Sequence, residues 1–165
     1  MEKNKVIKSR IFTWESLQRQ LAIWRFKDKK IVFTNGCFDI LHLGHIEILA
    51  KAKSLGNILI VGLNSDESIH RIKGPHRPVN SHHARMITLA SLVFVDAVVI
   101  FEEDTPYELI KLVQPDILVK GKDYEGLEIV GSDIVKARGG EVVTIELTRG
   151  YSTTHIIEKA HKVHL

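Results

Sequence analysis

Five short apolar runs, separated by segments with helical periodicity, constrain the fold more than any other feature of this chain. The runs cover residues 31–33, 58–63, 95–101, 116–119 and 141–147, and most positions in each are apolar. Strands of this kind are buried on both faces, as in a parallel sheet that helices cover on each side. Helical crossovers join parallel strands in a right-handed sense. We therefore predict an α/β fold with a doubly wound, Rossmann-like, five-stranded parallel sheet.

The N-terminal segment precedes this alternation and carries a helical pattern of its own. One stripe of the predicted helix is apolar and consists of Trp14, Leu17, Leu21 and Trp24. Thr13 is a suitable N-cap for it. We expect residues 1–28 to form an added N-terminal helical extension and residues 29–165 to form the main domain. An exposed apolar stripe favours a packed lid or a contact with a second copy, so we predict a homodimer.

Charge and composition exclude several classes of protein. The formal net charge is +3, but Lys and Arg are scattered and never form a run of five or six, which suits small anionic ligands better than nucleic acid. The N-terminus lacks the apolar segment of a signal peptide, and no apolar stretch reaches the roughly 18 residues that a membrane span requires. We therefore expect a cytoplasmic protein with no nucleic-acid or membrane partner. Cys37 is the only cysteine, which excludes an internal disulfide and a multi-cysteine zinc site.

The loop after the first apolar run holds two histidines directly before a predicted helix. In a doubly wound sheet, ligands bind beyond the carboxyl ends of the strands, and His42 and His45 lie in such a loop. The unpaired N–H groups and the positive dipole at a helix N-terminus attract phosphate, and Gly44 lets a phosphate chain approach closely. Two imidazoles at this spacing can donate hydrogen bonds to charge that develops on a phosphoryl group. The pattern predicts a phosphate site.

The same two histidines also fit a purely structural role, as a capping pair or as a half-exposed couple with no ligand. A zinc site is disfavoured. The metalloprotease motif His-Glu-x-x-His spaces its zinc ligands i, i+4 around a glutamate, whereas this pair is spaced i, i+3 without one. We therefore expect no metal site here. The sequence contains neither the P-loop motif nor the G-x-G-x-x-G motif, which disfavours P-loop kinases and dinucleotide-dependent dehydrogenases.

A cationic, turn-rich segment follows the second apolar run. It spans residues 71–78 and includes Lys73 and Arg77. Charged lids of this kind close over anions in many enzymes, although a plain solvated loop has the same composition. Arg85 follows on the next predicted helix, for which Asn80 is a suitable N-cap. The side chain of Arg85 can face either a phosphate or a carboxylate on the helix surface.

Two motifs give the chain a resemblance to a known family. Gly36-Cys37-Phe38-Asp39 followed by His42-Leu43-Gly44-His45 resembles the signature of the cytidylyltransferase-like nucleotidyltransferases, and Gly150-Tyr151-Ser152-Thr153-Thr154 resembles their second motif. Further motifs, in order between residues 30 and 160, resemble the D-glycero-β-D-manno-heptose 1-phosphate adenylyltransferases of this family. These motifs are Asn64-Ser65-Asp66, Lys73-Gly74, Arg77-Pro78-Val79-Asn80, Glu102-Glu103-Asp104-Thr105-Pro106 and Val119-Lys120-Gly121-Lys122-Asp123-Tyr124.

The resemblance implies a fold of the nucleotidyltransferase type, with residues 29–165 as the nucleotidyltransferase domain. It also implies that a sugar-phosphate oxygen attacks the α-phosphorus of ATP, with Mg2+ accompanying the triphosphate. The products would be pyrophosphate and ADP-heptose, a precursor of the lipopolysaccharide core. The catalytic residues would be His42, His45 and Lys73. The nucleotide would contact Gly36, Cys37, Phe38, Gly44, Lys120, Asp123, Ser152 and Thr153. The sugar phosphate would contact Asp39, Arg77 and Arg85.

Two alternative functions stay open at this point. A cytidylyltransferase that acts on glycerol 3-phosphate or a similar alcohol phosphate would use the same phosphate-binding groups, and base choice depends on backbone contacts that a sequence does not expose. A non-catalytic nucleotide-binding module would keep the fold without turnover. Loss of either motif histidine would favour such a module, and both histidines are present.

Overall fold

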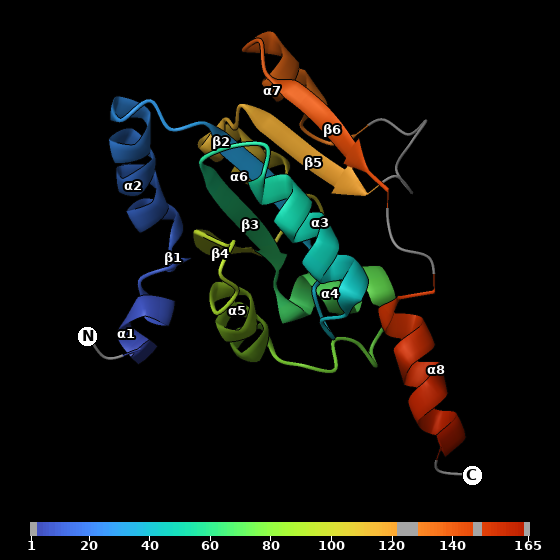
Figure 1. Cartoon of the computed structure of the whole chain (residues 1–165). Coiled ribbons are helices and arrows are strands. Elements are labelled where there is room, and N and C mark those ends of the chain that lie inside the picture. Colours follow the sequence, from blue (N-terminus) through green and yellow to red (C-terminus); the bar gives the residue numbers. More distant parts are fainter. Residues whose placement is uncertain (1–2, 122–128, 147–149, 164–165) are drawn as a thin grey trace.

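The computed structural model describes residues 3–121, 129–146 and 150–163 of the chain. In chain order, the elements are α1 (Lys3–Lys8), β1 (Ile11–Phe12), α2 (Trp14–Phe26), β2 (Ile31–Gly36), α3 (Leu43–Lys53), β3 (Ile58–Asn64), α4 (Asp66–Lys73), α5 (His82–Ala90), β4 (Ala97–Phe101), α6 (Tyr107–Val113), β5 (Ile117–Gly121), α7 (Ser132–Ala137), β6 (Glu141–Ile145) and α8 (Thr153–Val163) (Figure 1). No helix within these ranges is long and apolar enough to cross a membrane. The cytoplasmic location stays a prediction.

The strands form one parallel sheet in the order β1-β4-β3-β2-β5-β6. The predicted α/β class and parallel sheet are confirmed, but the predicted number of strands is wrong, because the described residues form six strands and not five. The missed strand is β1, whose Ile11 and Phe12 pair with Val98 and Val99 of β4. Two residues are too few to show an alternation pattern. The N-terminal segment therefore consists of two helices and an edge strand rather than one helix.

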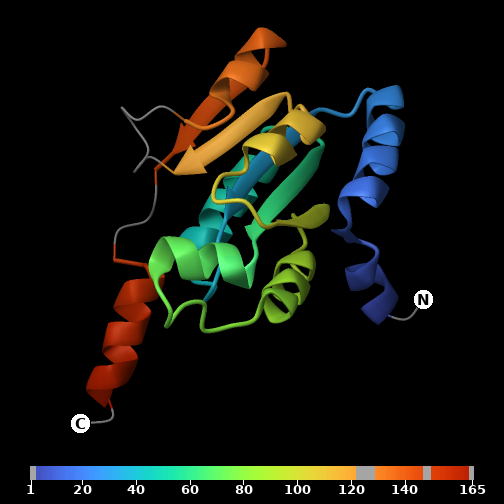
Figure 2. The same ribbon diagram turned by 180° about the vertical axis from the view of Figure 1, so that it is seen from behind.

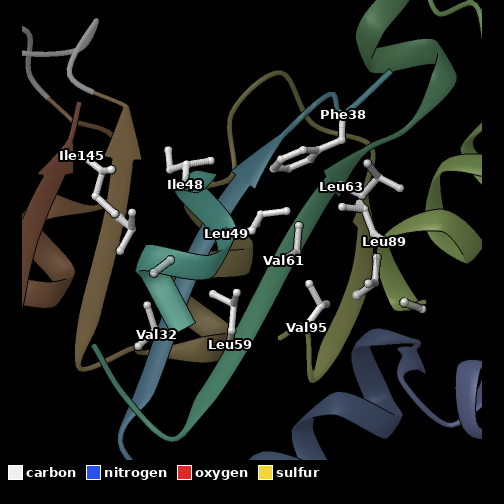
Figure 3. Close-up of a cluster of buried hydrophobic side chains, with 14 of the residues drawn as sticks. Val32, Phe38, Ile48, Leu49, Leu59, Val61, Leu63, Leu89, Val95 and Ile145 are labelled. Carbon is white, nitrogen blue, oxygen red and sulfur yellow. The ribbon is translucent and has the colours of Figure 1, made fainter. Parts of the chain in front are cut away.

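Two hydrophobic layers enclose the sheet, because successive strand residues point to opposite faces. One layer joins the sheet to α3 and α5 and includes Val32, Leu59 and Val61 (Figure 3). The other joins the sheet to α2, α6 and α7 and includes the alternate residues Phe33 and Ile60. Figures 1 and 2 show α3 and α6 on opposite sides of the sheet. Burial on both faces explains why the strand segments are nearly continuous in apolar residues.

Helix α2 packs its apolar stripe against the chain's own sheet. Leu17 and Leu21 are buried in the second layer, and Trp14 Nε1 donates a hydrogen bond to Ile100 O of β4 at 2.8 Å. Thr13 caps the helix as predicted, in a capping box. Because the stripe is covered within the chain, it no longer favours a contact with a second copy. The homodimer and the domain division at residue 28 stay predictions.

The strand order reverses beside β2. In doubly wound sheets, ligands bind in a crevice at the carboxyl ends of the strands where such a reversal occurs. From β2 the chain adds β3 and β4 on one side, and it later returns to add β5 and β6 on the other. Strands β2 and β5 are paired neighbours, so their carboxyl ends open next to each other. Helices α4 and α8 lie beyond these ends (Figure 1).

Candidate active site

A cavity of about 580 Å³ opens at the carboxyl ends of β2, β3 and β5. Its walls come from the loop after β2, the end of α4, the segment 104–106 and the start of α8. Most of the predicted site residues line it, namely Gly36, Cys37, Phe38, Asp39, His42, Gly44, His45, Lys73, Arg77, Lys120, Ser152 and Thr153. Asp123, predicted to bind the nucleotide, lies outside the described residues. Segments far apart in the sequence thus form one concave, polar surface.

The two motif histidines stack on each other at the N-terminus of α3. Their ring centroids are 3.7 Å apart, and the rings are inclined by 23°. His42 is the N-cap residue, with an extended backbone (φ −140°, ψ 172°), but its side chain makes no capping hydrogen bond. The interpretation of the two residues as a capping pair is therefore wrong. Within the described chain, Nδ1 of His42 and Nδ1 of His45 are buried without a hydrogen-bond partner. Buried polar atoms without partners are rare and are typical of functional sites.

Glycine at two positions lets the rings of this loop pack closely. A Cβ on Gly44 would lie 3.3 Å from Cε1 and Nδ1 of His42, and a Cβ on Gly36 would lie 3.1 Å from Cε2 of Phe38. Phe38 itself has a φ of +44°, in the left-handed region that non-glycine residues rarely adopt. Its ring centroid is 5.1 Å from that of His45, at an interplanar angle of 57°. The loop therefore brings the Phe38 ring into contact with His45.

Both histidines have lowered pKa values, so they are neutral near pH 7. Burial lowers the pKa of His42. Burial, followed by the neighbouring His42, lowers the pKa of His45 from 6.5 to about 4, and the Ile40 backbone offsets only part of this shift. A bound anion would oppose both effects, because a nearby negative charge favours the imidazolium.

Helix α4 carries Lys73, in its last turn, to the rim of the cavity. The start of the helix is anchored, because Ser65 Oγ accepts a hydrogen bond from Ser68 N and Ser68 Oγ donates one to Glu103 O, each at 3.0 Å. Burial raises the pKa of the Cys37 thiol, and the charge of Lys73 offsets part of that rise. The Lys73 ammonium therefore acts electrostatically on the loop that holds the histidines.

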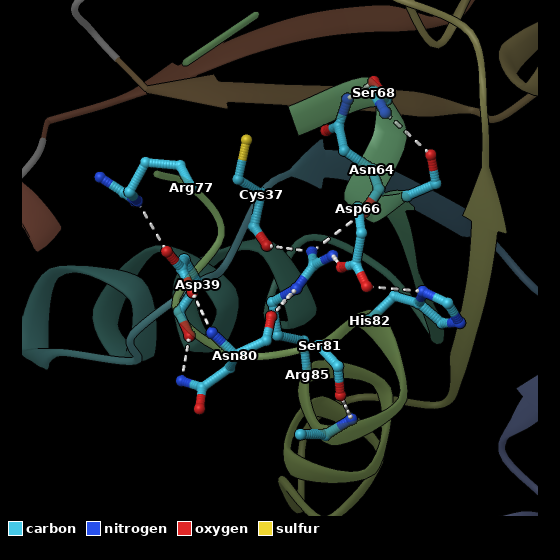
Figure 4. Close-up of polar contacts among 12 residues, drawn as sticks. Cys37, Asp39, Asn64, Asp66, Ser68, Arg77, Asn80, Ser81, His82 and Arg85 are labelled. Atoms are coloured by element: carbon cyan, nitrogen blue, oxygen red, sulfur yellow. Dashed lines mark hydrogen bonds and ion pairs between the residues drawn. The ribbon is translucent and has the colours of Figure 1, made fainter. Parts of the chain in front are cut away.

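Asp39 holds Arg77 beside the same loop (Figure 4). Its buried carboxylate accepts a hydrogen bond from Arg77 Nε at 2.8 Å and from the backbone N–H groups of Val79 and Asn80 at 2.9 Å. Burial alone would raise the pKa of Asp39, but hydrogen bonds from Asn80, Val79 and Arg77 outweigh burial and lower it. The carboxylate is thus ionised and engaged within the chain. Asp39 lines the cavity, and its contact with the sugar phosphate stays a prediction.

Comparison with known proteins identifies the family from the same segments. A model of the family described as cytidylyltransferase-like matches residues 33–159, a range that includes the histidine loop, α4 and the start of α8. The chain belongs to the cytidylyltransferase-like family. The resemblance predicted from the two sequence motifs is confirmed, and the chain is a nucleotidyltransferase.

Curated relatives cover most of this chain at high identity. Bifunctional protein HldE of Wolinella succinogenes is 55% identical over 150 residues, which are 91% of this chain and 31% of that protein. Bifunctional protein HldE of Nitratiruptor sp. is 63% identical over 133 residues, which are 81% of this chain and 28% of that protein. The chain thus spans about a third of the length of these curated relatives.

Two solved structures share the fold. The lipopolysaccharide core biosynthesis protein from Thermoplasma volcanium has a TM-score of 0.60 and 30% identity, over 75% of this chain and 99% of that one. Pantoate-beta-alanine ligase from Francisella tularensis has a TM-score of 0.55 and 19% identity, over 89% of this chain and 76% of that one. The second likeness concerns the fold alone. Both agree with a Rossmann-like arrangement of the sheet.

Two further motif segments of the family close the cavity on the side of β5. Lys120, at the end of β5, is buried, and its ammonium donates a hydrogen bond to Asn35 Oδ1 at the end of β2. This bond bridges the two strands at the reversal of strand order. Ser152 caps α8, since its Oγ accepts a hydrogen bond from His155 N at 3.1 Å. Ser152 and Thr153 therefore lie at a helix N-terminus that opens on the cavity, where phosphate is favoured.

The sequence prediction missed several residues that line the cavity. Asn35 is the penultimate residue of β2, and Asn64 is the last residue of β3. Tyr151 and Thr154 flank the two predicted residues at the start of α8. Their position at the carboxyl ends of strands is the signal that could have found the two asparagines. Tyr151 and Thr154 belong to the second motif, so they could have been found as its remaining members.

Arg85 is the predicted phosphate ligand that the structure places elsewhere. It does not line the cavity, its side chain is 1% exposed, and its guanidinium donates to groups of the chain itself (Figure 4). We therefore correct that prediction. The predicted N-cap of α5 is also wrong by one residue, because Ser81 caps the helix while Asn80 bonds to Asp39.

Proposed function

We propose that the chain is an adenylyltransferase that converts ATP and D-glycero-β-D-manno-heptose 1-phosphate to ADP-heptose and pyrophosphate. Family membership supports nucleotidyl transfer, and the heptose-type motifs of the sequence support this acceptor. The likeness to relatives named bifunctional protein HldE and to a lipopolysaccharide core biosynthesis protein supports the same assignment. The observation that carries the proposal is the stacked pair His42 and His45, which lines one cavity with Lys73 and the start of α8.

In the proposed reaction, a phosphate oxygen of the sugar phosphate attacks the α-phosphorus of ATP. The bond between the α-phosphorus and the oxygen that bridges to the β-phosphorus breaks, and pyrophosphate leaves with that oxygen and the electron pair. The attacking phosphate is already ionised, so it needs no general base. Because it attacks the α-phosphorus directly, no covalent enzyme intermediate forms. Catalysis then depends on placing the two substrates and on stabilising charge, as in phosphoryl transfer generally.

His42 and His45 would supply the charge stabilisation. They lie at the N-terminus of α3, where backbone N–H groups and the helix dipole also favour phosphate. The approach of a triphosphate would raise the pKa of both imidazoles, so that a positive donor forms where charge grows on the phosphates. Because the rings are 3.7 Å apart, the first proton taken up opposes the second, and the pair titrates as one unit.

The other lining residues would hold the two substrates around this pair. Lys73 would reach the phosphates from the rim, and Ser152 and Thr153 would bind them at the start of α8. Arg77, which Asp39 orients, would bind the sugar phosphate. The nucleotide would contact Gly36, Cys37, Phe38, Gly44, Lys120 and Asp123.

We propose Mg2+ as the divalent cation that accompanies the triphosphate. Both carboxylates that line the described part of the cavity are paired with arginine, Asp39 with Arg77 and Asp104 with Arg71. Among the residues that the structure describes, no group of three or more His, Cys, Asp or Glu side chains could hold a metal ion. Mg2+ prefers oxygen ligands and binds through substrate phosphates in many enzymes. The cavity therefore suits an ion held by the nucleotide, whose phosphate charge it would neutralise.

Pyrophosphate release in the presence of Mg2+ tests the proposal. ATP or CTP is offered with D-glycero-β-D-manno-heptose 1-phosphate or, separately, with glycerol 3-phosphate. We expect release only with ATP and the heptose phosphate. Release confined to CTP and glycerol 3-phosphate would instead assign cytidylyl transfer. Folded protein that releases no pyrophosphate in any pairing would contradict the proposal and favour a nucleotide-binding module.

A further inference from the structure

Arg85 lies where three segments around the cavity meet, namely the loop after β2, the junction of β3 and α4, and the segment 77–80 (Figure 4). Its Nε donates to Asn80 O at 3.0 Å, and its Nη1 donates to Cys37 O at 2.6 Å and to Asn64 O at 2.9 Å. Its Nη2 donates to Asp66 Oδ1 at 2.7 Å. Four of the five N–H groups of a guanidinium are thus fixed by the chain itself.

Three of the four partners of Arg85 belong to segments that carry a proposed phosphate ligand. Cys37 belongs to the loop of the stacked histidines. Asp66 is the first residue of α4, and Lys73 is the last. Asn80 follows Arg77 in the segment that Asp39 also holds. One buried side chain therefore connects three groups that would act on the same phosphate chain.

Asn80 is fixed between Arg85 and the second buried charge, Asp39. Asn80 N donates to Asp39 Oδ1 at 2.9 Å, and Asn80 Nδ2 donates to Asp39 O at 2.8 Å, while Asn80 O accepts the hydrogen bond from Arg85. The segment 77–80 cannot shift relative to the histidine loop without breaking one of these bonds. The two buried charges thus hold Arg77 in place from two directions.

The chemistry of Arg85 suits holding these segments rather than binding a substrate. A buried charge needs a partner, and Asp66 supplies it. Burial alone would raise the pKa of Asp66, but hydrogen bonds from Arg85 and the His82 backbone outweigh burial and lower it. The planar guanidinium fixes the directions of several N–H donors at once, which the ammonium of a lysine cannot do.

We propose that Arg85 is a positioning residue of the transfer reaction, which sets the stacked histidines, Lys73 and Arg77 at their working distances without touching a substrate. This inference rests on the proposed function, because the spacing matters only when these groups act on one phosphate chain. A misplacement of about 1 Å can slow an enzyme about 10²-fold even when the change lies away from the reacting atoms.

Arg85→Lys tests the proposal, with Arg10→Lys as the matched control. Arg10 Nη1 also donates to two backbone carbonyls, Ala90 O at 3.2 Å and Leu92 O at 2.9 Å, but at the other end of α5 and away from the cavity lining. We expect Arg85→Lys to lower kcat about 10²-fold while KM for ATP changes much less. Arg10→Lys should keep the wild-type kcat and KM at temperatures where both variants are folded.

Hydrogen exchange gives a second readout that does not depend on activity. Arg85→Lys should speed the exchange of backbone amides in residues 36–45 and 77–80, and Arg10→Lys should leave these amides unchanged. If Arg85→Lys does not fold, Asp66→Asn takes its place. That variant removes the charged partner of Arg85 but leaves its three hydrogen bonds to carbonyls. We therefore expect a smaller loss of kcat and a smaller rise in the exchange rates of the same amides.

The outcomes separate this inference from the proposed function. If the wild-type chain releases no pyrophosphate, the proposed function fails, and unchanged exchange in Arg85→Lys would then also overturn the holding role. If the wild type is active and Arg85→Lys matches Arg10→Lys in kcat, the positioning role is wrong. A raised KM for the sugar phosphate at unchanged kcat would instead make Arg85 a substrate ligand.

Discussion

Helix α3 begins differently from α2, α4 and α5. Those three helices are capped by hydroxyl side chains, since Thr13, Ser65 and Ser81 each accept a hydrogen bond from a backbone N–H of the first turn. Helix α3 begins with His42, whose side chain makes no such bond. A hydroxyl cap stabilises a helix by about 1 kcal/mol. The chain therefore does without this stabilisation at a helix N-terminus that opens on the cavity.

Other features around the start of α3 also lower stability. The stacked histidines have buried Nδ1 atoms that lack partners in the described chain, and Phe38 adopts a φ of +44°. Unsatisfied polar atoms and strained conformations cluster at functional sites, because a group that must bind a ligand cannot be paired within the chain and a working geometry can be strained. The comparison with the capped helices teaches that these departures gather at the start of α3, whereas the start of α8, on the same cavity, keeps the hydroxyl cap of Ser152. Four predictions test that comparison.

Replacing His45 by alanine has the largest expected effect. The change removes one preorganised donor to the phosphate charge, so turnover should fall about 10²–10³-fold. Pyrophosphate release measures the loss, and circular dichroism checks that the variant is folded. His83→Ala is the control, because His83 is exposed on α5 and does not line the cavity. A near-normal rate in folded His45→Ala would remove His45 from the mechanism.

His42→Ser would convert the start of α3 to the hydroxyl type of its neighbours. The backbone at position 42 is already extended, as an N-cap requires. We expect turnover to fall about 10²-fold, whereas the free energy of unfolding should rise by up to about 1 kcal/mol. Urea unfolding and pyrophosphate release on the same preparation measure both. A variant that loses stability as well as turnover would contradict the inference that the start of α3 is less stable because it lacks a hydroxyl cap.

Acid should destabilise the chain through His45. Its folded pKa of about 4 lies below the ordinary value of 6.5, so the unfolded state binds more protons between these values. Stability is therefore full above pH 6.5 and falls as the pH drops towards 4, by up to about 2 kcal/mol between pH 7 and pH 5. Urea unfolding at the two pH values measures the loss. His45→Ala should reduce it, and equal losses in variant and wild type would argue against the lowered pKa.

Thr13→Ala has the smallest expected effect and completes the comparison. It removes the hydroxyl cap of α2, which lies away from the cavity. The free energy of unfolding should fall by about 1 kcal/mol, with no change in turnover. Thermal unfolding and pyrophosphate release measure the two quantities. A drop in turnover of folded protein would mean that α2 acts on the site.

The segments of the site could be predicted because they are local in sequence. The histidine loop and the start of α8 are contiguous motifs, and each lies between a strand and a helix. The rule that ligands bind at the carboxyl ends of parallel strands then brings them together, and residues of both motifs do line one cavity. Asn35 and Asn64 lie at the same strand ends but were not predicted to bind a ligand. Asn64 belongs to the motif Asn64-Ser65-Asp66, but an asparagine side chain by itself indicates no particular chemistry.

Arg85 and Asn80 mark the limit of that reasoning. Charge and family resemblance predict a phosphate ligand at Arg85, but only packing shows that its side chain is buried against Asp66 and three carbonyls. Asn80 and Ser81 are adjacent and both suit an N-cap. Ser81 caps α5, because Asn80 is held by Asp39, a residue 41 positions earlier in the chain.

The sequence by itself determined the α/β class, the parallel sheet and the segments that meet at the cavity, since these depend on periodicity and on short contiguous motifs. Only the tertiary structure decided the sixth strand, the stacking of His42 on His45 and the interior role of Arg85. The physical reason is that a buried polar group must form hydrogen bonds with the groups that lie next to it in the folded chain. Those groups can come from distant parts of the sequence.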